Sequence, residues 1–282
     1  MIVVTGVGGQ LGYDVVKELN KRDIPCKGID KAELDITDKK AVLSFFEEQR
    51  PDAVIHCAAY NAVDNAESDV ESCDAVNIYG TENIAAACEK IGAKMMFFST
   101  DYVFSGEKNG EYEVWDKKEP LSVYGRSKSL GEDKIAEYTD KYFILRISWL
   151  FGLNGSNFVK TMLRLSKTNK ELNVVSDQVG SPTYTKDLAR LICDMIVTEK
   201  YGTYHATNEG FCSRTEFAGK IFELAGRDVR VNSVTSEEFS ARAVRPLNSR
   251  LSKRSLDSAG FSRLPNWEDA LERYLKEVEH NS

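Results

Sequence analysis

The stretch MIVVTGVGGQLG, residues Met1–Gly12, decides the fold. A short run of β-branched residues, Ile2–Thr5, is typical of a buried strand, and Gly6, Gly9 and Gly12 follow it at once. A tight turn from strand to helix needs residues that tolerate unusual backbone angles, and a diphosphate needs close approach to the N–H groups at a helix amino end. Because a strand precedes these glycines and a helical pattern follows them, the stretch predicts the phosphate-binding loop of a dinucleotide site.

Strand-like and helix-like segments alternate through the rest of the first half. Apolar runs near residues 26–30, 53–57, 93–99 and 142–148 predict further strands, and amphipathic segments between them predict helices. This alternation indicates an α/β protein with a doubly wound, Rossmann-type parallel sheet. The rhythm is less regular after residue 148, which predicts a smaller α/β substrate-binding lobe. We expect a dinucleotide-binding domain of residues 1–148 plus about 170–198, and a substrate lobe of about 149–169 and 199–282.

Composition narrows the class of protein. The chain has 282 residues, and its 37 basic and 44 acidic residues give a net charge of −7, which disfavours a general nucleic-acid binder because such a protein needs a basic face. No stretch approaches the roughly 20 apolar residues of a membrane span, and the opening lacks the basic region of a signal peptide. The six cysteines are scattered and the three histidines lie far apart, so we expect reduced thiols, a cytoplasmic location and no metal site.

A carboxylate, Asp30, stands at the end of the second expected strand. It can accept hydrogen bonds from an adenosine ribose and would oppose a 2′-phosphate, whereas neighbouring Lys31 would attract that phosphate. The two charges leave NADH and NADPH both open as cofactors. The alternative is that Asp30 is an ordinary surface turn residue.

Two tyrosine–lysine pairs have the spacing that puts both side chains on one helical face. Tyr13 and Lys17 lie in the helix of the glycine loop, and we expect a surface pair there. Tyr124 follows the strand-end hydroxyl of Thr100 by 24 residues, with Lys128 four residues further on, and ligands of parallel sheets collect beyond the carboxyl ends of strands. A phenol beside an ammonium can protonate a carbonyl oxygen, so we predict Tyr124 and Lys128 as the catalytic pair, with Thr100 orienting that oxygen.

The sequence resembles the extended short-chain dehydrogenase/reductases, and within them the dTDP-4-dehydrorhamnose reductase family. The resemblance covers nearly the whole chain through the motifs GGQLG, ELDITD, HCAAYNAVDNAE, STDYVF, YGRSK, NFVKTMLRL, VVSDQVGSPT and RPLNSRL, in that order. It implies reduction of dTDP-4-dehydro-β-L-rhamnose to dTDP-β-L-rhamnose by hydride from NADPH or NADH, in a monomer or weak homodimer. The chain departs from the family at Asn61, where threonine is common, and at Gly8, where a polar side chain is frequent.

The resemblance also implies roles for individual residues. The residues matched to cofactor contacts belong to the loop, the adenosine side, a strand-end segment and the catalytic pair: Gly6, Gly9, Gln10, Leu11, Asp30, Asp35, Ile36, Ala59, Tyr60, Asn61, Tyr124 and Lys128. Thr100, Asp101 and Trp149 match positions that contact the sugar. Arg245 and Arg250 are candidates for the diphosphate or thymidine side because a guanidinium matches phosphate geometry, and the alternative for both is ordinary surface arginine.

Two other functions stay open at this point. A nucleotide-sugar epimerase or dehydratase would share the glycine loop and the YxxxK spacing, although a dehydratase usually carries Glu where Tyr102 follows Asp101. A non-catalytic dinucleotide-binding regulatory subunit would show damage to the catalytic set, whereas Thr100, Tyr124 and Lys128 are all present.

Overall fold

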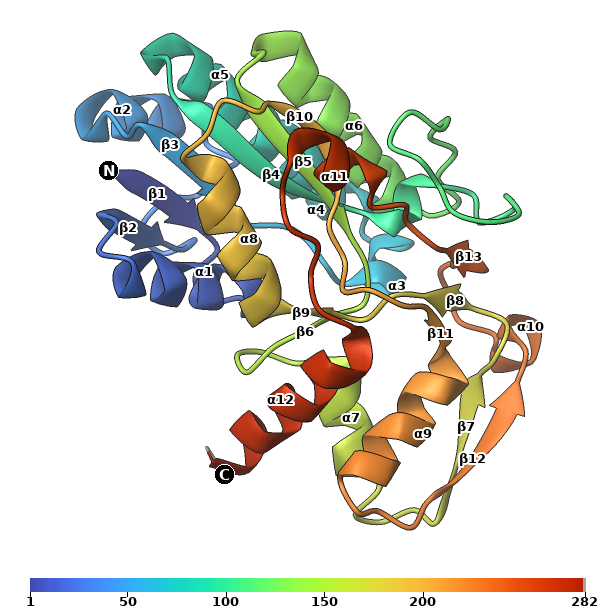
Figure 1. Ribbon diagram of the computed structural model, residues 1–282. Coiled ribbons are helices and arrows are strands. Elements are labelled where there is room, and N and C mark those ends of the chain that lie inside the picture. The colour runs from blue at the N-terminus through green and yellow to red at the C-terminus, as the bar shows by residue number, and fades with distance from the viewer. Residues whose placement is uncertain (281–282) are drawn as a thin grey trace.

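A six-stranded parallel sheet forms the centre of the computed structural model, which describes residues 1–280 (Figure 1). Its strand order is β10-β5-β4-β3-β1-β2, and every neighbouring pair is parallel. The predicted doubly wound α/β fold is therefore confirmed. The strands are β1 (Ile2–Thr5), β2 (Cys26–Ile29), β3 (Ala53–His56), β4 (Lys94–Thr100), β5 (Tyr142–Ile147) and β10 (Gly202–His205).

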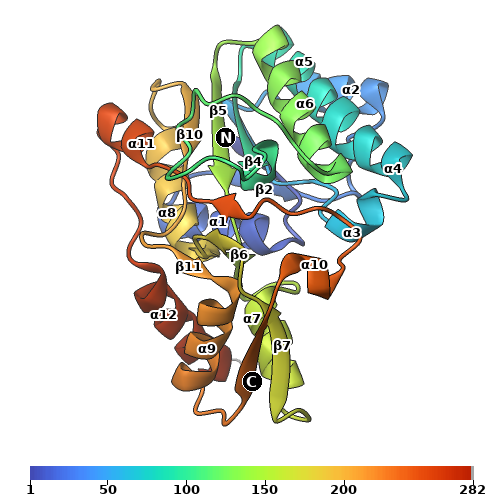
Figure 2. The same ribbon diagram turned by 90° about the vertical axis from the view of Figure 1, so that its right-hand side faces the viewer.

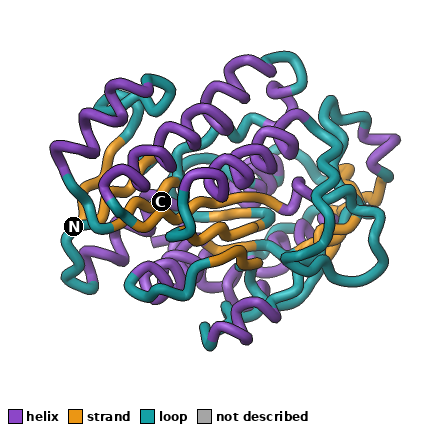
Figure 3. The backbone as a smooth tube through the Cα atoms, turned by 90° about the horizontal axis from the view of Figure 1, so that it is seen from above, coloured by secondary structure: helices purple, strands orange, loops and turns teal. Residues whose placement is uncertain are grey.

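Helices cover both faces of this sheet, as the view from above shows (Figure 3). Ile2 and Val4 of β1 belong to one apolar core and Val3 to the other, because successive side chains of a strand point to opposite faces. The first core also includes α1 (Gln10–Lys21), α8 (Thr185–Ile196) and α11 (Arg254–Ala259), and the second includes α2 (Lys39–Gln49), α5 (Thr81–Ile91) and α6 (Val123–Tyr138). Short helical segments join these elements: α3 (Val63–Ala66), α4 (Val70–Asp74), the π-helix η1 (Ala75–Gly80) and the 3₁₀-helix η2 (Asp101–Val103).

The remaining elements gather beyond one end of the sheet, in the lower part of Figures 1 and 2. A third apolar core lies among α7 (Phe158–Leu165), α9 (Arg214–Leu224) and α12 (Trp267–His280). Small sheets complete this region, and a short helix, α10 (Ser236–Phe239), follows β12. The pairings are β7 (Glu171–Val175) with β12 (Arg230–Val234), β6 (Leu150–Phe151) with β9 (Thr183–Tyr184), and β8 (Val179–Gly180) with both β11 (Cys212–Ser213) and β13 (Asn248–Ser249).

Strand pairing places two segments differently from the expected domain division. β10 is the edge strand of the main sheet, parallel to β5, although its residues were expected in the substrate lobe. β7 pairs with β12 outside the main sheet, although its residues were expected in the dinucleotide-binding domain. Periodicity identifies a strand but not its partner, and β10 returns to the sheet only because α8 crosses over and packs on α1. The two-lobe division itself stays a prediction.

Candidate active site

The glycine loop joins the end of β1 to the amino end of α1. Gly6 has φ +68°, and a Cβ there would lie 2.6 Å from the backbone nitrogen of Ala58. A Cβ on Gly12 would lie 2.4 Å from the carbonyl oxygen of Gly6, so α1 can approach the loop this closely only without a side chain. Because the amino end of α1 opens directly from this turn, its N–H groups are available to an anion.

A cavity of about 300 Å³ lies at the carboxyl ends of the central strands, between this loop and α6. Its lining combines the loop, the strand ends and the helix that carries the predicted catalytic pair. The predicted site residues that line it are Gly6, Gly9, Gln10, Leu11, Ala59, Asn61, Thr100, Asp101, Tyr124, Lys128 and Trp149. Of the other residues matched to the cofactor, Asp30, Asp35, Ile36 and Tyr60 lie outside this lining.

The predicted catalytic pair projects from the first turns of α6 into the cavity. Ser122 caps this helix by accepting a hydrogen bond from the Gly125 N–H at 3.1 Å. Lys128 is 3% exposed, and its ammonium lies 3.9 Å from the centre of the Phe97 ring. Burial lowers the pKa of Lys128 to about 7, although the nearby carboxylate of Glu132 opposes this change. Lys128 is therefore close to the pH at which its charge is lost, so small changes around it shift the balance between its two forms.

The Tyr124 phenol has the opposite shift. Burial raises its pKa, the charges of Asp101 and Tyr102 add to the rise, and a hydrogen bond with Thr100 opposes it. The phenol thus keeps its proton at neutral pH, which is the form that a general acid needs.

The end of β4 supplies polar groups beside this phenol. The Thr100 hydroxyl accepts a hydrogen bond from the Tyr102 N–H at 3.2 Å and donates one to the Asp101 carboxylate at 3.0 Å. Tyr102 packs edge-to-face on Tyr124, with ring centres 5.7 Å apart. Burial raises the pKa of Asp101, against the hydrogen bonds from Ser249 and Thr100.

The adenosine-side residues lie at the end of β2. The Asp30 carboxylate accepts the Gly8 N–H at 2.7 Å, and a Cβ on Gly8 would lie 2.5 Å from that carboxylate. Glycine at position 8 therefore leaves the space that Asp30 occupies, which accounts for this departure from the family pattern. The Asp35 carboxylate accepts from Thr37 and lies 3.6 Å from the Lys31 ammonium, so Lys31 faces Asp35.

Ile36 and Tyr60 have structural contacts of their own. Ile36 is buried and lies where a Cβ on Gly80 would meet it. Asn77 holds the Tyr60 backbone, because its side chain accepts the Tyr60 N–H at 2.9 Å and donates to the Tyr60 carbonyl at 3.1 Å. The same Asn77 amide donates to Ser127 on α6 at 2.9 Å, so it ties the strand-end segment to the catalytic helix.

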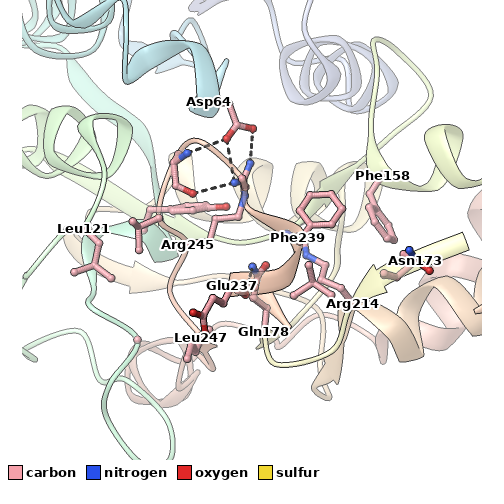
Figure 4. Close-up of a pocket in the computed structure, with 18 of the residues that line it drawn as sticks. Asp64, Leu121, Phe158, Asn173, Gln178, Arg214, Glu237, Phe239, Arg245 and Leu247 are labelled. Carbon is pink, nitrogen blue, oxygen red and sulfur yellow. Dashed lines mark hydrogen bonds and ion pairs between the residues drawn. The ribbon is translucent and has the colours of Figure 1, made fainter. Parts of the chain in front are cut away.

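A second, larger cavity of about 1280 Å³ opens next to the first and is lined from both parts of the chain (Figure 4). Arg245 lines it, together with Asp64 of α3 and Phe158 of α7. Arg250 lines neither of these two cavities, and its guanidinium donates to the Asn248 side chain at 2.8 Å. The structure thus brings one of the two predicted arginines to a cavity and leaves the other away from it.

Arg214 is a residue that the sequence analysis missed. It lines both cavities, as Tyr102 does, and its guanidinium stacks 3.6 Å from the centre of a Trp149 ring. Trp149 is a non-glycine residue with φ +48°, and Gly180 leaves room for its indole, since a Cβ there would lie 2.9 Å from the ring. Arg214 is the first residue of an unremarkable amphipathic helix, so no sequence signal marks it.

These residues fit a dinucleotide cofactor. Glycines remove the side chains that would block a diphosphate at α1, and the cavity runs from them to Tyr124 and Lys128. Among residues 1–280, no group of three His, Cys, Asp or Glu side chains is placed to hold a metal ion. No helix in that range is both long and apolar enough to span a membrane.

Among doubly wound proteins, a YxxxK pair on the helix before β5, facing a glycine loop, defines the short-chain dehydrogenase/reductases, and the third apolar core beyond the sheet is typical of their extended branch. The chain matches the family described as the RmlD substrate binding domain over residues 1–280. It is 40% identical to a dTDP-4-dehydrorhamnose reductase of Aggregatibacter actinomycetemcomitans, with 96% of each chain covered.

Two solved structures agree with this match. The chain resembles a dTDP-4-dehydrorhamnose reductase from Clostridium acetobutylicum with a TM-score of 0.97 at 42% identity, covering 99% of each chain. It resembles the same enzyme from Bacillus anthracis, in complex with NADP, with a TM-score of 0.95 at 45% identity, covering 98% of each chain. The chain belongs to the dTDP-4-dehydrorhamnose reductase family, as its sequence predicted.

Proposed function

We propose that this chain reduces dTDP-4-dehydro-β-L-rhamnose to dTDP-β-L-rhamnose with NADPH or NADH. The observation that carries the proposal is that the two cavities meet at Tyr102 and Arg214, next to the predicted catalytic residues of the smaller cavity. The glycine loop, Tyr124 and Lys128 line the smaller cavity, and Tyr102 and Arg214 connect it to the larger one. A cofactor in the first cavity and a sugar nucleotide in the second would meet beside Tyr124.

In this proposal Tyr124 is the general acid. The cofactor, when bound, supplies a hydride to the sugar carbonyl carbon. Tyr124 donates its proton to the carbonyl oxygen, and its raised pKa keeps that proton in place until the oxygen gains charge. The Thr100 hydroxyl, held by the Tyr102 N–H, would turn its proton from Asp101 to the carbonyl oxygen and so orient that oxygen beside the phenol.

Lys128 stabilises the phenolate that this step leaves. Its charge is expensive in a buried position, which is why burial lowers its pKa to about 7. A new negative charge on Tyr124, four residues away on the same helical face, favours the charged form of Lys128 again. The charged form of Lys128 is thus favoured at the moment when the proton leaves Tyr124 and a phenolate forms.

The larger cavity is the proposed site of the nucleotide and the sugar. Trp149, which lines the smaller cavity and stacks on Arg214 where the cavities meet, offers an aromatic surface to the sugar, and Arg245 of the larger cavity offers a guanidinium to the diphosphate. Arg214 adds a second cation between the cavities, where burial lowers its pKa but Tyr102 and Asp101 favour its charge.

The decisive experiment is a panel of dTDP-4-keto-sugars with each reduced cofactor, followed by the loss of reduced-nicotinamide absorbance. We expect steady turnover with the 4-dehydro-β-L-rhamnose nucleotide. Cofactor that stays bound through purification, with no net oxidation, would instead indicate an epimerase or dehydratase. Absence of turnover with every keto-sugar would favour a non-catalytic subunit.

We also infer that the chain acts in the cytoplasm as a monomer or weak homodimer. The charge balance and the scattered cysteines support the location. Analytical ultracentrifugation over a range of concentrations would test the oligomeric state.

A further inference from the structure

Residues 236–247, here named the strap, form one wall of the larger cavity. The strap leaves β12 of the second lobe, passes through α10 and ends at β13. Figure 4 shows Glu237, Phe239, Arg245 and Leu247 of the strap around the cavity, opposite Phe158 of α7. A sugar nucleotide in this cavity would therefore lie against the strap.

The strap is tied at both ends. Near β12, the Ser236 N–H and hydroxyl donate to Asp177 at 2.9 and 2.7 Å. At the far end Asp64 of α3 accepts three bonds: from the Ala243 N–H at 3.0 Å, and from the Arg245 guanidinium at 3.1 and 2.6 Å. One carboxylate on the main domain thus holds the wall that comes from the other lobe.

Asp64 also lies next to the cofactor cavity. Val63, which precedes it directly, and Asn61 line that cavity. On the other side, Arg245 and Tyr102 both line the larger cavity, and Tyr102 packs edge-to-face on Tyr124. The guanidinium also donates to the Ala243 carbonyl at 3.1 Å, so Asp64 and the strap itself hold it in place.

We propose that Asp64 is a positioning residue for the sugar nucleotide: it fixes the Arg245 guanidinium and the end of the strap across the larger cavity, so that a nucleotide diphosphate meets a preformed donor. The inference rests on the proposed function. A bidentate carboxylate–guanidinium pair adds orientation to charge, and preorganisation of a donor raises affinity because less freedom is lost on binding. Asp64 itself would not touch the reacting atoms.

The test is Asp64→Asn, with dTDP as the binding probe. Asparagine keeps an oxygen for the Ala243 N–H but loses the charge that holds Arg245. We expect dTDP affinity to fall about tenfold, and KM for the keto-sugar to rise by a similar factor, as for the loss of one charged contact. Turnover number and NADPH affinity should stay within about twofold, because binding to ground state and transition state would weaken equally.

Asp257→Asn is the matched control. Asp257 also accepts a bidentate pair, from Arg263, and the two aspartates are 47% and 46% exposed. Asp257 lies on α11 and Arg263 just beyond it, and neither residue lines either cavity, so dTDP affinity should not change. Equal losses in the two variants would mean that Asp64 acts only through general stability.

A double-mutant cycle with Arg245→Lys tests whether Asp64 changes dTDP affinity through Arg245. Lysine keeps the charge but cannot form the bidentate pair. In that background Asp64→Asn should change dTDP affinity by less than about twofold, because contacting residues are not additive. A full further loss, or tighter dTDP binding by Asp64→Asn alone, would overturn the inference. If the wild-type chain fails to bind dTDP at all, the proposed function fails instead.

Discussion

Two tyrosine–lysine pairs with the same spacing have opposite surroundings in this molecule. Tyr13 is 37% exposed on α1, and the Lys17 ammonium lies over its ring at 4.7 Å, in contact with solvent. Lys128 is almost fully buried, and it shares a cavity with Tyr124. The spacing sets only the common face of the helix. The position at the carboxyl ends of the strands, and the burial that follows from it, make one pair chemically different from the other.

The largest expected effect separates the pairs by rate. Tyr124→Phe should lower the turnover number by roughly 10²–10⁴, because a general acid is lost while the helix keeps its contacts. Cofactor affinity should persist in this variant. Tyr13→Phe serves as the control and should leave the turnover number nearly unchanged. A similar fall in the turnover number of Tyr13→Phe, or a Tyr124→Phe enzyme that stays active, would mean that Tyr124 is not the general acid.

The second effect distinguishes Lys128 from Lys17 by the pH dependence of kcat/KM. As pH rises through about 7, the buried Lys128 loses its proton, so kcat/KM for the reduced cofactor should fall about tenfold per pH unit above that value. Lys128→Arg, which stays charged, should flatten this alkaline limb even where it lowers the maximum rate. Lys17→Arg should leave the profile unchanged. A profile without an alkaline limb near this pH would show that Lys128 is not titrating.

A smaller effect concerns the preference between NADH and NADPH. We expect either cofactor at the amino end of α1, the helix that carries Tyr13 and Lys17. Asp30 opposes a 2′-phosphate, while Lys31 is exposed and paired with Asp35, so both charges act weakly in high dielectric. We expect kcat/KM values with NADH and NADPH within about tenfold of each other. Asp30→Ala should shift the ratio toward NADPH. A preference above about a hundredfold in the wild type would refute this balance, and an unchanged ratio in Asp30→Ala would place Asp30 away from the ribose.

The smallest effect compares the two lysines by stability. Lys17→Met should lower the free energy of unfolding by no more than about 1 kcal/mol, the size of an exposed cation–π contact. Lys128→Met should raise it by about 1 kcal/mol or more, because each unit of pKa depression corresponds to about 1.4 kcal/mol against the charged form. Denaturant unfolding of both variants would measure the difference.

The size of this second change depends on pH. The folded pKa of Lys128 is lowered to about 7 while the unfolded lysine titrates near its ordinary value of 10.5, so the unfolded state binds more protons between these values. The wild-type chain should gain stability as pH rises through that window. The advantage of Lys128→Met should therefore be complete below pH 7 and disappear toward pH 10. A constant difference would mean that burial does not perturb Lys128.

Much of the fold and part of the candidate site could be predicted from local sequence patterns. The glycine loop, the alternating strands and helices, and the catalytic helix depend on residues close in sequence, and periodicity or turn chemistry reveals them. The resemblance to the family then extended this to individual contacts. Of these, Gly6, Thr100 and Trp149 line the same cavity although they come from different elements.

The features that escaped prediction depend on distant parts of the chain. Asp64 and Arg245 are separated by 181 positions, and neither residue's neighbours indicate the other. Arg214 reaches Trp149 only because α9 packs beside that tryptophan, with Phe217 of α9 stacked on its ring, and β10 pairs with β5 only after α8 has crossed the sheet. Arg250 was predicted on the same ground as Arg245, but it turns toward Asn248 instead. A short motif records which side chains are near in sequence and not the direction in which each one points.

The common wall of the two cavities has a consequence for inhibition. Because Tyr102 and Arg214 line both cavities, the partition along that wall is only one side chain thick. A single compound that joins a nicotinamide mimic to a thymidine diphosphate could occupy both at once. The linked halves would lose translational freedom only once, so their affinities would reinforce each other without any new contact. Selectivity would come from the junction, where the linker would pass Arg214 stacked on Trp149.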